Sequence, residues 1–376
     1  MKEKIINILA DLIKLKSITP NDNGCQEYIS NYLKSYGFEE KKFEFNGVSN
    51  TILKRGNKKP VLGFVGHTDV VPIGDESQWS TNPFILEEKN NKIFGRGTAD
   101  MKGSIACMMY ATGEFIAQNN NFDGTLIYIL TSDEEGAAID GIQRLVNENI
   151  LQKYDIDCCL IGEPTSKDNI GDTIKNGRRG SLSGELIIEG LQGHIAYPKN
   201  SLNPIHLASP VIHQLINEKY DKGNDYFLPT SFQISNIHSG YGVENIIPGK
   251  ISIKFNFRYS TETNEKELIT RVENILNSSK INYTIDWKHS GEPYLTTKKE
   301  FLEKCQSAIN SVADIKPNIT TDGGTSDGRF MAKICDEVIE FGLLNHSIHK
   351  VDEHTTSDDL VILSNIYKKI LSEVLG

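Results

Sequence analysis

The chain has 376 residues, of which 38% are hydrophobic and 24% charged, so it is neither a disordered nor a collagen-like chain. Forty Lys and Arg against fifty Asp and Glu give a net charge of −10, which argues against general affinity for nucleic acid or anionic membranes. At roughly 150 residues per domain, this length predicts two or three domains.

The N-terminal segment and the cysteines indicate the cellular compartment that we expect for the protein. Residues 1–20 contain no uninterrupted apolar core and no small-residue cleavage site, so we expect them to belong to the fold. Apolar runs elsewhere are far too short to span a bilayer. The six cysteines form no CxxC pair and no disulfide-like spacing: Cys25, Cys107, Cys158, Cys159, Cys305 and Cys335. We therefore expect a soluble cytoplasmic protein with reduced, mostly buried thiols.

The first 165 residues alternate helix-like and strand-like patterns, in the order typical of an α/β sheet with helical connections. A long helix is predicted after Asp100, running through Met108 and Phe115. The other predicted helices are 2–16, 25–36 and 140–149. The predicted strands are 42–46, 51–54, 61–65, 125–130 and 157–161.

From about residue 180 the pattern changes to β-α-β-β-α-β, which is typical of a ferredoxin-like unit. Its predicted elements are strand 181–189, helix 203–217, strands 231–237 and 251–258, helix 264–277 and strand 281–287. The first pattern then returns with helix 299–312, a Gly-rich turn at 322–328, strand 337–341 and helix 357–373. The simplest interpretation is one α/β domain, residues 1–179 and 293–376, that carries an inserted α+β domain at 180–292.

Three apolar strands end in residue types that bind metals. Strand 61–65 leads to His67 and Asp69, strand 125–130 leads to the segment 131–136, and strand 157–161 leads to Glu163. Each piece alone is more often a turn, a solvated acidic face or a helix cap, and the same holds for Asp100 at the start of its helix. Because the carboxyl ends of strands line the ligand crevice of α/β sheets, we expect these residues to converge.

Converging carboxylates repel one another unless a cation lies between them or one of them is protonated. Imidazole and carboxylate ligands without a thiolate suit zinc, cobalt or manganese at a hydrolytic site with open coordination positions. The sequence therefore predicts a metal-dependent hydrolase.

The motifs resemble those of the co-catalytic zinc aminoacylase/carboxypeptidase family. The motifs that carry the resemblance are Gly66-His67-Thr68-Asp69-Val70-Val71-Pro72, residues 95–103, residues 131–136 and Gly162-Glu163-Pro164. The resemblance covers essentially the whole chain. It implies a zinc-exopeptidase-like catalytic domain with a mixed sheet flanked by helices, plus an inserted ferredoxin-like dimerisation domain.

The same resemblance implies two Zn²⁺ per subunit, with Co²⁺ as a replacement. His67 and Glu163 would bind one ion, Glu135 and His349 the other, and Asp100 would bridge them beside a non-proline cis peptide. The family pattern places the last ligand four residues after Asn345, which selects His349 over His346 and His354, a loop histidine being the alternative.

Three further residues take catalytic roles in the family. The carboxylate of Asp69 would fix the tautomer and ring orientation of His67. Glu134 would be the general base, with a second metal ligand or an exposed acid as the alternatives. His194 would reach across a homodimer to support the oxyanion, with a core or surface histidine as the alternative.

Further segments, at 176–184, 192–198, 255–258 and 323–330, resemble the branch of the family that acts on N-succinyl-L,L-2,6-diaminopimelate. The implied reaction gives succinate and L,L-2,6-diaminopimelate, on the route to lysine and meso-diaminopimelate. Arg178 and Arg258 would bind the substrate carboxylates, with structural salt bridges as the alternative; Arg179 and Arg329 are expected to be structural. The supporting contacts would be Ser181, Tyr197, Asn245, Gly324, Thr325 and Asn345.

Two other functions remain open at this point. One is a sister deacylase that acts on N-acetylornithine. Segments 178–181 and 323–329 distinguish the two activities, because they resemble the branch that acts on the succinyl substrate. The other is a metal-dependent binding protein without catalysis, which would be expected to lack Glu134 or a ligand.

Overall fold

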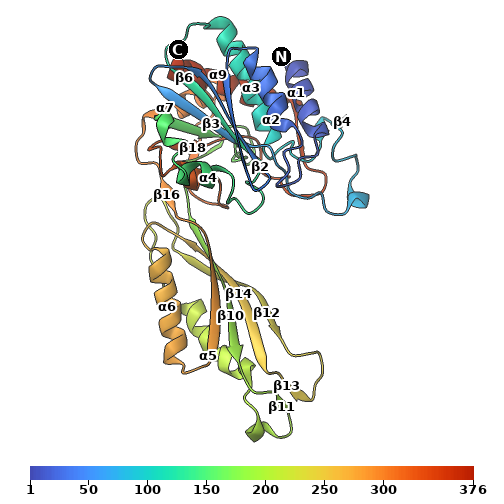
Figure 1. Ribbon diagram of the computed structural model, residues 1–376, viewed down its shortest axis with the longest axis vertical. Coiled ribbons are helices and arrows are strands. Elements are labelled where there is room, and N and C mark those ends of the chain that lie inside the picture. The colour runs from blue at the N-terminus through green and yellow to red at the C-terminus, as the bar shows by residue number, and fades with distance from the viewer. The chain divides into compact units, whose positions relative to one another are not determined.

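The computed structural model describes residues 1–376, which divide into two compact units (Figure 1). The first unit comprises Met1–Gly177, Leu295–Thr320 and Ser326–Gly376, and the second comprises Arg178–Tyr294 and Thr321–Thr325. The predicted boundaries, 179/180 and 292/293, each lie two residues from these. No helix combines the length and apolar character needed to cross a membrane.

The first unit is built on a mixed eight-stranded sheet in the order β1-β2-β6-β3-β7-β18-β8-β17. Its strands are β1 Glu39–Phe45, β2 Val48–Gly56, β3 Val61–His67, β6 Thr125–Thr131, β7 Cys158–Ile161, β8 Thr173–Lys175, β17 Asn318–Thr320 and β18 Val338–Glu340. Strand β3 lies between β6 and β7 and is parallel to both, so their carboxyl ends share one edge. The predicted α/β class with a mixed sheet is confirmed.

Helices cover this sheet with apolar faces. They are α1 Lys2–Lys14, α2 Cys25–Lys34, α3 Lys102–Gln118, α4 Ile142–Asn147, α7 Glu300–Ala313, α8 Gly328–Met331 and α9 Ser357–Leu375. Helix α3 is buried over most of its surface because it packs against both α1 and α9 (Figure 1). Every residue of β3 and β6 is buried as well, which explains their unbroken apolar runs. The carboxyl ends of these strands therefore sit on a rigid core.

The second unit has the predicted β-α-β-β-α-β order. Its sheet, in the order β12-β14-β10-β15, is antiparallel throughout and consists of β10 Gly180–Glu189, β12 Ser231–Ser239, β14 Lys250–Tyr259 and β15 Tyr283–Gly291. Alternate residues of β14 are buried, and they form one core with α5 Pro204–Asn217 and α6 Glu265–Ser278 (Figure 1). The other face of the sheet lacks such a cover.

Several short strands escaped the sequence analysis. They are β8 and β17 in the eight-stranded sheet, β4 Glu87–Lys89, β5 Lys92–Phe94 and β19 His354–Thr355 in a small sheet of the first unit, β11 Gly193–His194 and β13 Ile246–Ile247 in the second, and β9 Gly177–Arg178 and β16 Tyr294–Leu295 where the chain passes between units. Strands of two or three residues carry too little periodicity to be recognised.

The segment Thr321–Thr325 also differs from the prediction, because it belongs to the second unit and not to the α/β domain. Its Thr321 hydroxyl donates to the carbonyl of Tyr226, and the Gly324 carbonyl accepts a 3.1 Å hydrogen bond from Arg178.

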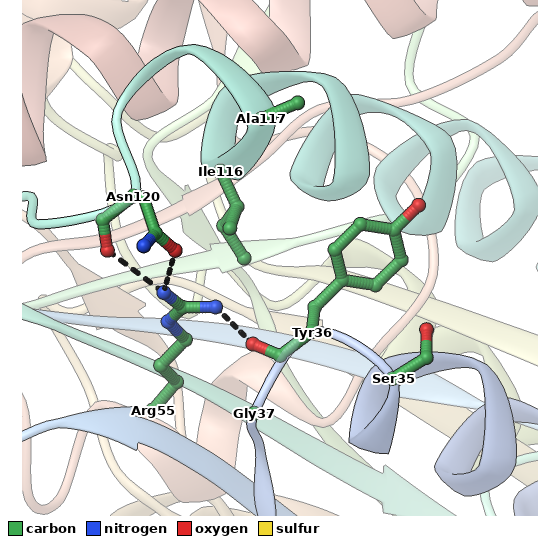
Figure 2. A pocket seen from close by; sticks show the side chains of 7 residues that line it. All are labelled: Ser35, Tyr36, Gly37, Arg55, Ile116, Ala117 and Asn120. Atoms are coloured by element: carbon green, nitrogen blue, oxygen red, sulfur yellow. Dashed lines mark hydrogen bonds between the residues drawn. The ribbon is translucent and has the colours of Figure 1, made fainter.

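A surface cavity of about 620 Å³ in the first unit surrounds Arg55 of β2 (Figure 2). The guanidinium donates to the main-chain carbonyl of Tyr36 and to both the carbonyl and the side-chain oxygen of Asn120, the latter two at 2.8 and 2.9 Å. Arg55 therefore connects the turns that follow α2 and α3, and both terminal nitrogens of its guanidinium are engaged within the protein.

Candidate active site

The ends of three parallel strands bring the predicted ligands together. His67 is the last residue of β3 and lies opposite Thr131, the last residue of β6. Strand β7 ends at Ile161, opposite Val65 of β3, and Glu163 follows two residues later. Residues 67, 134, 135 and 163 thus emerge at one edge of the sheet, as expected for parallel strands.

Asp100 lies between two histidines that come from opposite ends of the chain. Its Oδ1 is 3.3 Å from Nε2 of His67, and its Oδ2 is 3.3 Å from Nε2 of His349. His67 Nε2 is also 3.8 Å from Oε1 of Glu163, and His349 Nε2 is 2.9 Å from Oε1 of Glu135. The five residues form two half-sites that share one carboxylate.

These distances fit two bound cations. Ligand atoms about 2.0–2.2 Å from a transition metal lie roughly 3–4 Å from one another, which is the spacing seen in each half-site. Asp100 Oδ1 is buried without a hydrogen bond of ordinary geometry, as expected for an atom whose partner is a metal. The nitrogen and oxygen donors, without a thiolate, suit borderline transition metals.

The loop that carries Asp100 is held by Glu353, a residue the sequence analysis missed. One carboxylate oxygen of Glu353 accepts the N–H groups of Ala99 and Asp100, at 2.9 and 3.0 Å. The other accepts the N–H of Gly97 at 3.0 Å and Nη1 of Arg96 at 2.8 Å. All five residues are buried, and burial raises the pKa of Glu353. The peptide from Asp100 to Met101 is cis, as the family resemblance implies.

Asp69 makes hydrogen bonds that position His67, Glu134 and Glu135. Nδ1 of His67 is 2.9 Å from the main-chain carbonyl of Asp69, whereas the Asp69 carboxylate is 3.6 Å away. That carboxylate accepts the N–H groups of Glu134 and Glu135, at 3.3 and 3.1 Å. The main-chain carbonyl of Asp69, and not the predicted carboxylate, is therefore the hydrogen-bond partner that sets the His67 tautomer, because the carboxylate is engaged by the N–H groups of the two glutamates.

Glu134 lies close to the half-site of His67 and Glu163, with ligand atoms of all three within 4.8 Å of one another. Burial raises the pKa of Glu134 well above its ordinary value, and the charge of Glu163 adds to the effect. A carboxylate with a raised pKa takes up a proton readily, which is the property that a general base requires.

Of the three histidines between residues 346 and 354, only His349 lies with Asp100 and Glu135. Hydrogen bonds with these two carboxylates raise the pKa of His349 to about 10. The rings of His346 and His354 instead face each other, with their Nε2 atoms 3.2 Å apart.

Two buried aspartates near the glutamates were also missed by the sequence analysis. The Asp133 carboxylate accepts the N–H groups of Ala137, Ile139 and Asp140 and so holds the loop after Glu135. Asp327 has a pKa raised to about 7 by burial, with contributions from Asp69 and Asp133. Both lie inside segments that carry the family resemblance, 131–136 and 323–330, but nothing in their spacing marks them as buried.

The second unit gathers its predicted residues in two groups. In the first group, Ser181 and Arg258 pair across β10 and β14, and Arg178 contacts Gly324, which Thr325 follows in the same segment.

The second group lies on or beside the small antiparallel pair of β11 and β13, which are separated in the chain by α5 and β12. The ring of His194 lies 5.5 Å from that of Tyr197. The main-chain carbonyl of Asn245 accepts the N–H of Ile195 at 3.1 Å, which ties the two strands together beside His194.

Asn345, in the first unit, donates its own N–H to the carbonyl of Ser166 at 2.9 Å. This bond ties the start of the segment that carries His349 to the loop that follows Glu163.

Comparisons with known proteins identify the family of the chain and its fold. Residues 63–373 match the model of peptidase family M20/M25/M40. The chain is 47% identical to the succinyl-diaminopimelate desuccinylase of Hydrogenovibrio crunogenus, over 98% of each chain. An M20 family metallo-carboxypeptidase from Sulfolobus solfataricus shares the fold, with a TM-score of 0.81 and 17% identity over 98% of each chain. A dinuclear metal binding peptidase of the M20 family from Bacillus subtilis has a TM-score of 0.72 and 16% identity, over 98% of this chain and 97% of that one.

Proposed function

The chain belongs to peptidase family M20/M25/M40, and from that premise we propose that it hydrolyses N-succinyl-L,L-2,6-diaminopimelate to succinate and L,L-2,6-diaminopimelate. One observation carries the proposal: the Asp100 carboxylate faces both His67 and His349, with Glu134 beside them. The name of the similar Hydrogenovibrio crunogenus protein supports the choice of substrate. The reaction would serve lysine and meso-diaminopimelate biosynthesis.

The metals proposed are two Zn²⁺ per chain, with Co²⁺ able to replace them. His67 and Glu163 would hold one ion, Glu135 and His349 the other, and Asp100 both. When bound, such ions polarise the scissile carbonyl and lower the pKa of a water molecule.

The residues of the chain move the proton. Glu134 takes a proton from the attacking water as the water oxygen bonds to the amide carbon, and returns it to the nitrogen when the C–N bond breaks. Asp69 keeps the main chain of Glu134 and Glu135 in place, so that one carboxylate serves the metal and the other serves the water.

Substrate recognition is proposed for residues of the second unit. Arg178 and Arg258 would bind carboxylates of the substrate, because a guanidinium matches a carboxylate with two parallel hydrogen bonds. Supporting contacts are proposed for Ser181, Tyr197, Asn245, Gly324 and Thr325, and for Asn345 of the first unit.

A homodimer is proposed from the surface of the second unit. Strand β12 is an edge strand of its sheet and is largely exposed. Large apolar side chains in β12 and in the segments that flank β11 and β13 are also exposed: Leu191, Ile195, Tyr197, Ile237, Tyr241 and Val243. An uncovered edge and an apolar surface favour pairing with a second copy. In that dimer we propose that His194 of one subunit supports the oxyanion in the other.

The cytoplasm is the proposed compartment. All six cysteines are free and buried, and burial raises the pKa of the Cys107, Cys158 and Cys159 thiols, which keeps them unreactive.

The proposal is tested with metal-stripped enzyme, before and after addition of zinc, on N-succinyl-L,L-diaminopimelate and on N-acetylornithine. We expect zinc-dependent release of succinate and no cleavage of the acetyl substrate. Arg258→Ala should raise KM about tenfold or more, as loss of a charged hydrogen bond predicts. Arg271→Ala on α6 is the matched control. Cleavage of the acetyl substrate alone would contradict the proposed substrate. Cleavage of neither substrate would contradict the proposal that the protein is an amide hydrolase of this kind.

A further inference from the structure

Two histidines outside the ligand cluster, His346 and His354, lie on either side of His349 in the sequence, and their rings face each other. Nε2 of His346 and Nε2 of His354 are 3.2 Å apart, and their ring centroids are 5.1 Å apart. Neither residue contacts Asp100 or Glu135 through any ion pair of the kind that His349 makes. The proposed reaction gives this pair no task.

The tautomer of His354 is set by a main-chain carbonyl. Its Nδ1 lies 2.8 Å from the carbonyl of Asp352. Because a carbonyl only accepts hydrogen bonds, Nδ1 of His354 carries the proton, and its Nε2 accepts a hydrogen bond from Nε2–H of His346, a contact that a metal ion between the two nitrogens would replace. The same arrangement, with one ring nitrogen donating to a carbonyl, orients histidines that bind metals through the other nitrogen.

The two rings are held in position by the fold. His354 lies on β19, which pairs with β5, and its ring packs against that of Phe94. The hydroxyl of Ser347 donates to the His354 carbonyl at 2.7 Å and accepts the His354 N–H at 3.2 Å. Lys350 donates to the carbonyl of His346 at 2.7 Å. Little ordering would remain to be done when an ion binds.

The spacing of the nitrogens matches a bound transition metal. Two imidazole nitrogens about 2.0–2.1 Å from a tetrahedral Zn²⁺ lie about 3.3 Å apart. Burial, His354, Lys92 and Lys350 lower the pKa of His346, which favours the neutral ring that binds metals, while Asp359 opposes them. The two lysines also repel a cation, so the affinity should be lower than that of the carboxylate-rich half-sites.

We propose that His346 and His354 form a third, exchangeable site for a borderline divalent metal such as Zn²⁺, Ni²⁺ or Cu²⁺. Nitrogen donors select these ions over Mg²⁺ and Ca²⁺. His346 is exposed, so water fills the remaining coordination positions. An ion bound here links the two ends of residues 346–354 and restrains His349 between them.

A second cluster of ligand types supplies the contrast. Glu265, His289 and Glu292 also lie together in the second unit. There Glu265 faces Nδ1 of His289 at 3.6 Å, whereas Glu292 faces Nε2 at 3.8 Å. The two carboxylates thus lie nearest to different nitrogens of the ring, and the cluster is remote in the sequence from residues 346–354. His289 is therefore the control.

The test is equilibrium dialysis of the full-length protein against Zn²⁺ and, separately, Ni²⁺, after loading with two equivalents of zinc and desalting. Wild type should bind one further equivalent. His346→Ala and His354→Gln should each weaken that step about tenfold or more, because altering even the support of a metal ligand costs about 10–100-fold. His289→Gln should leave the step unchanged.

Three results would contradict the proposed site. The wild-type protein binds no further equivalent of metal, both substituted proteins still bind it with wild-type affinity, or only one of the two substitutions weakens its binding. His346→Ala removes an exposed side chain, so the fold is retained in at least that variant. Failure to load the first two zinc ions would instead count against the proposed function, because the third step is measured separately.

Discussion

Glu353 offers the sharpest perturbation of the site, because it binds no metal in our assignment but holds the loop of Asp100. We consider Glu353→Gln, which keeps the shape of the side chain. Each carboxylate oxygen accepts two hydrogen bonds: Ala99 and Asp100 on one, Gly97 and Arg96 on the other. Whichever oxygen becomes an NH₂ group, two donors then face a donor.

The expected size follows from burial. The side chains of Arg96 and Glu353 are 2% and 1% exposed, and breaking a buried ion pair costs about 3–5 kcal/mol. In the variant, Arg96 still donates hydrogen bonds to the carbonyls of Lys350 and Pro72, at 3.1 and 3.3 Å. We therefore expect the free energy of unfolding to fall by about 3 kcal/mol, the lower end of that range. Displacement of the Asp100 loop should also weaken zinc binding about 10–100-fold.

The assay uses two readouts. Trp79 lies in the first unit with the Arg96 guanidinium 5.1 Å from its ring, so its fluorescence during urea denaturation reports locally. Trp287→Phe removes the only other tryptophan. Zinc affinity is measured on the stripped protein by competition with a chelator.

Glu337→Gln is the matched control. Glu337 is also a buried glutamate of the first unit, but it accepts the N–H of Phe301 in α7 and supports no metal ligand. Its substitution should leave zinc affinity unchanged within about a factor of two. If Glu353→Gln lowers the free energy of unfolding but leaves zinc affinity at the wild-type value, the reasoning that Glu353 positions Asp100 is wrong.

Three further outcomes are expected. Glu134→Ala should keep its bound zinc and lose about 10²–10⁴-fold in turnover, measured by succinate release; near wild-type turnover would mean that Glu134 is not the base. His194→Ala should lower turnover without changing the zinc content measured by atomic absorption, and loss of zinc would contradict the oxyanion role. Burial tends to raise the pKa of Asp172, but the main-chain N–H groups of residues 167–169 lower it overall. Its contribution to stability is therefore present above the unfolded pKa of about 3.9 and lost as the pH falls through the lower native value. In urea denaturation at a series of acidic pH values, Asp172→Asn should make the free energy of unfolding fall less steeply as the pH is lowered. The same steepness as in the wild-type protein would refute this.

The sequence predicts the parts of the fold that obey local rules. Strands β3, β6 and β7 are continuous apolar runs, and because they are parallel their carboxyl ends meet at one edge. The convergence of His67, Glu135 and Glu163 could therefore be predicted before any coordinates. The β-α-β-β-α-β order of the second unit follows in the same way from alternation and amphipathic spacing.

The support of the site could not be predicted, since it depends on contacts between distant segments. Glu353 is one acid in an acidic stretch, and its role arises from donors more than 250 positions earlier in the chain. The facing of His346 and His354 depends on the pairing of β19 with β5, two strands too short to recognise. The inclusion of Thr321–Thr325 in the second unit likewise rests on tertiary contacts.

The central claim is that Asp100 is shared by two metal ions. It is tested most directly by anomalous diffraction at the zinc edge, on crystals of the protein loaded with two equivalents of zinc. We predict two anomalous peaks, one in contact with His67 and Glu163, the other with Glu135 and His349, and both in contact with Asp100. A single peak, or a pair of which one does not touch Asp100, would contradict the account.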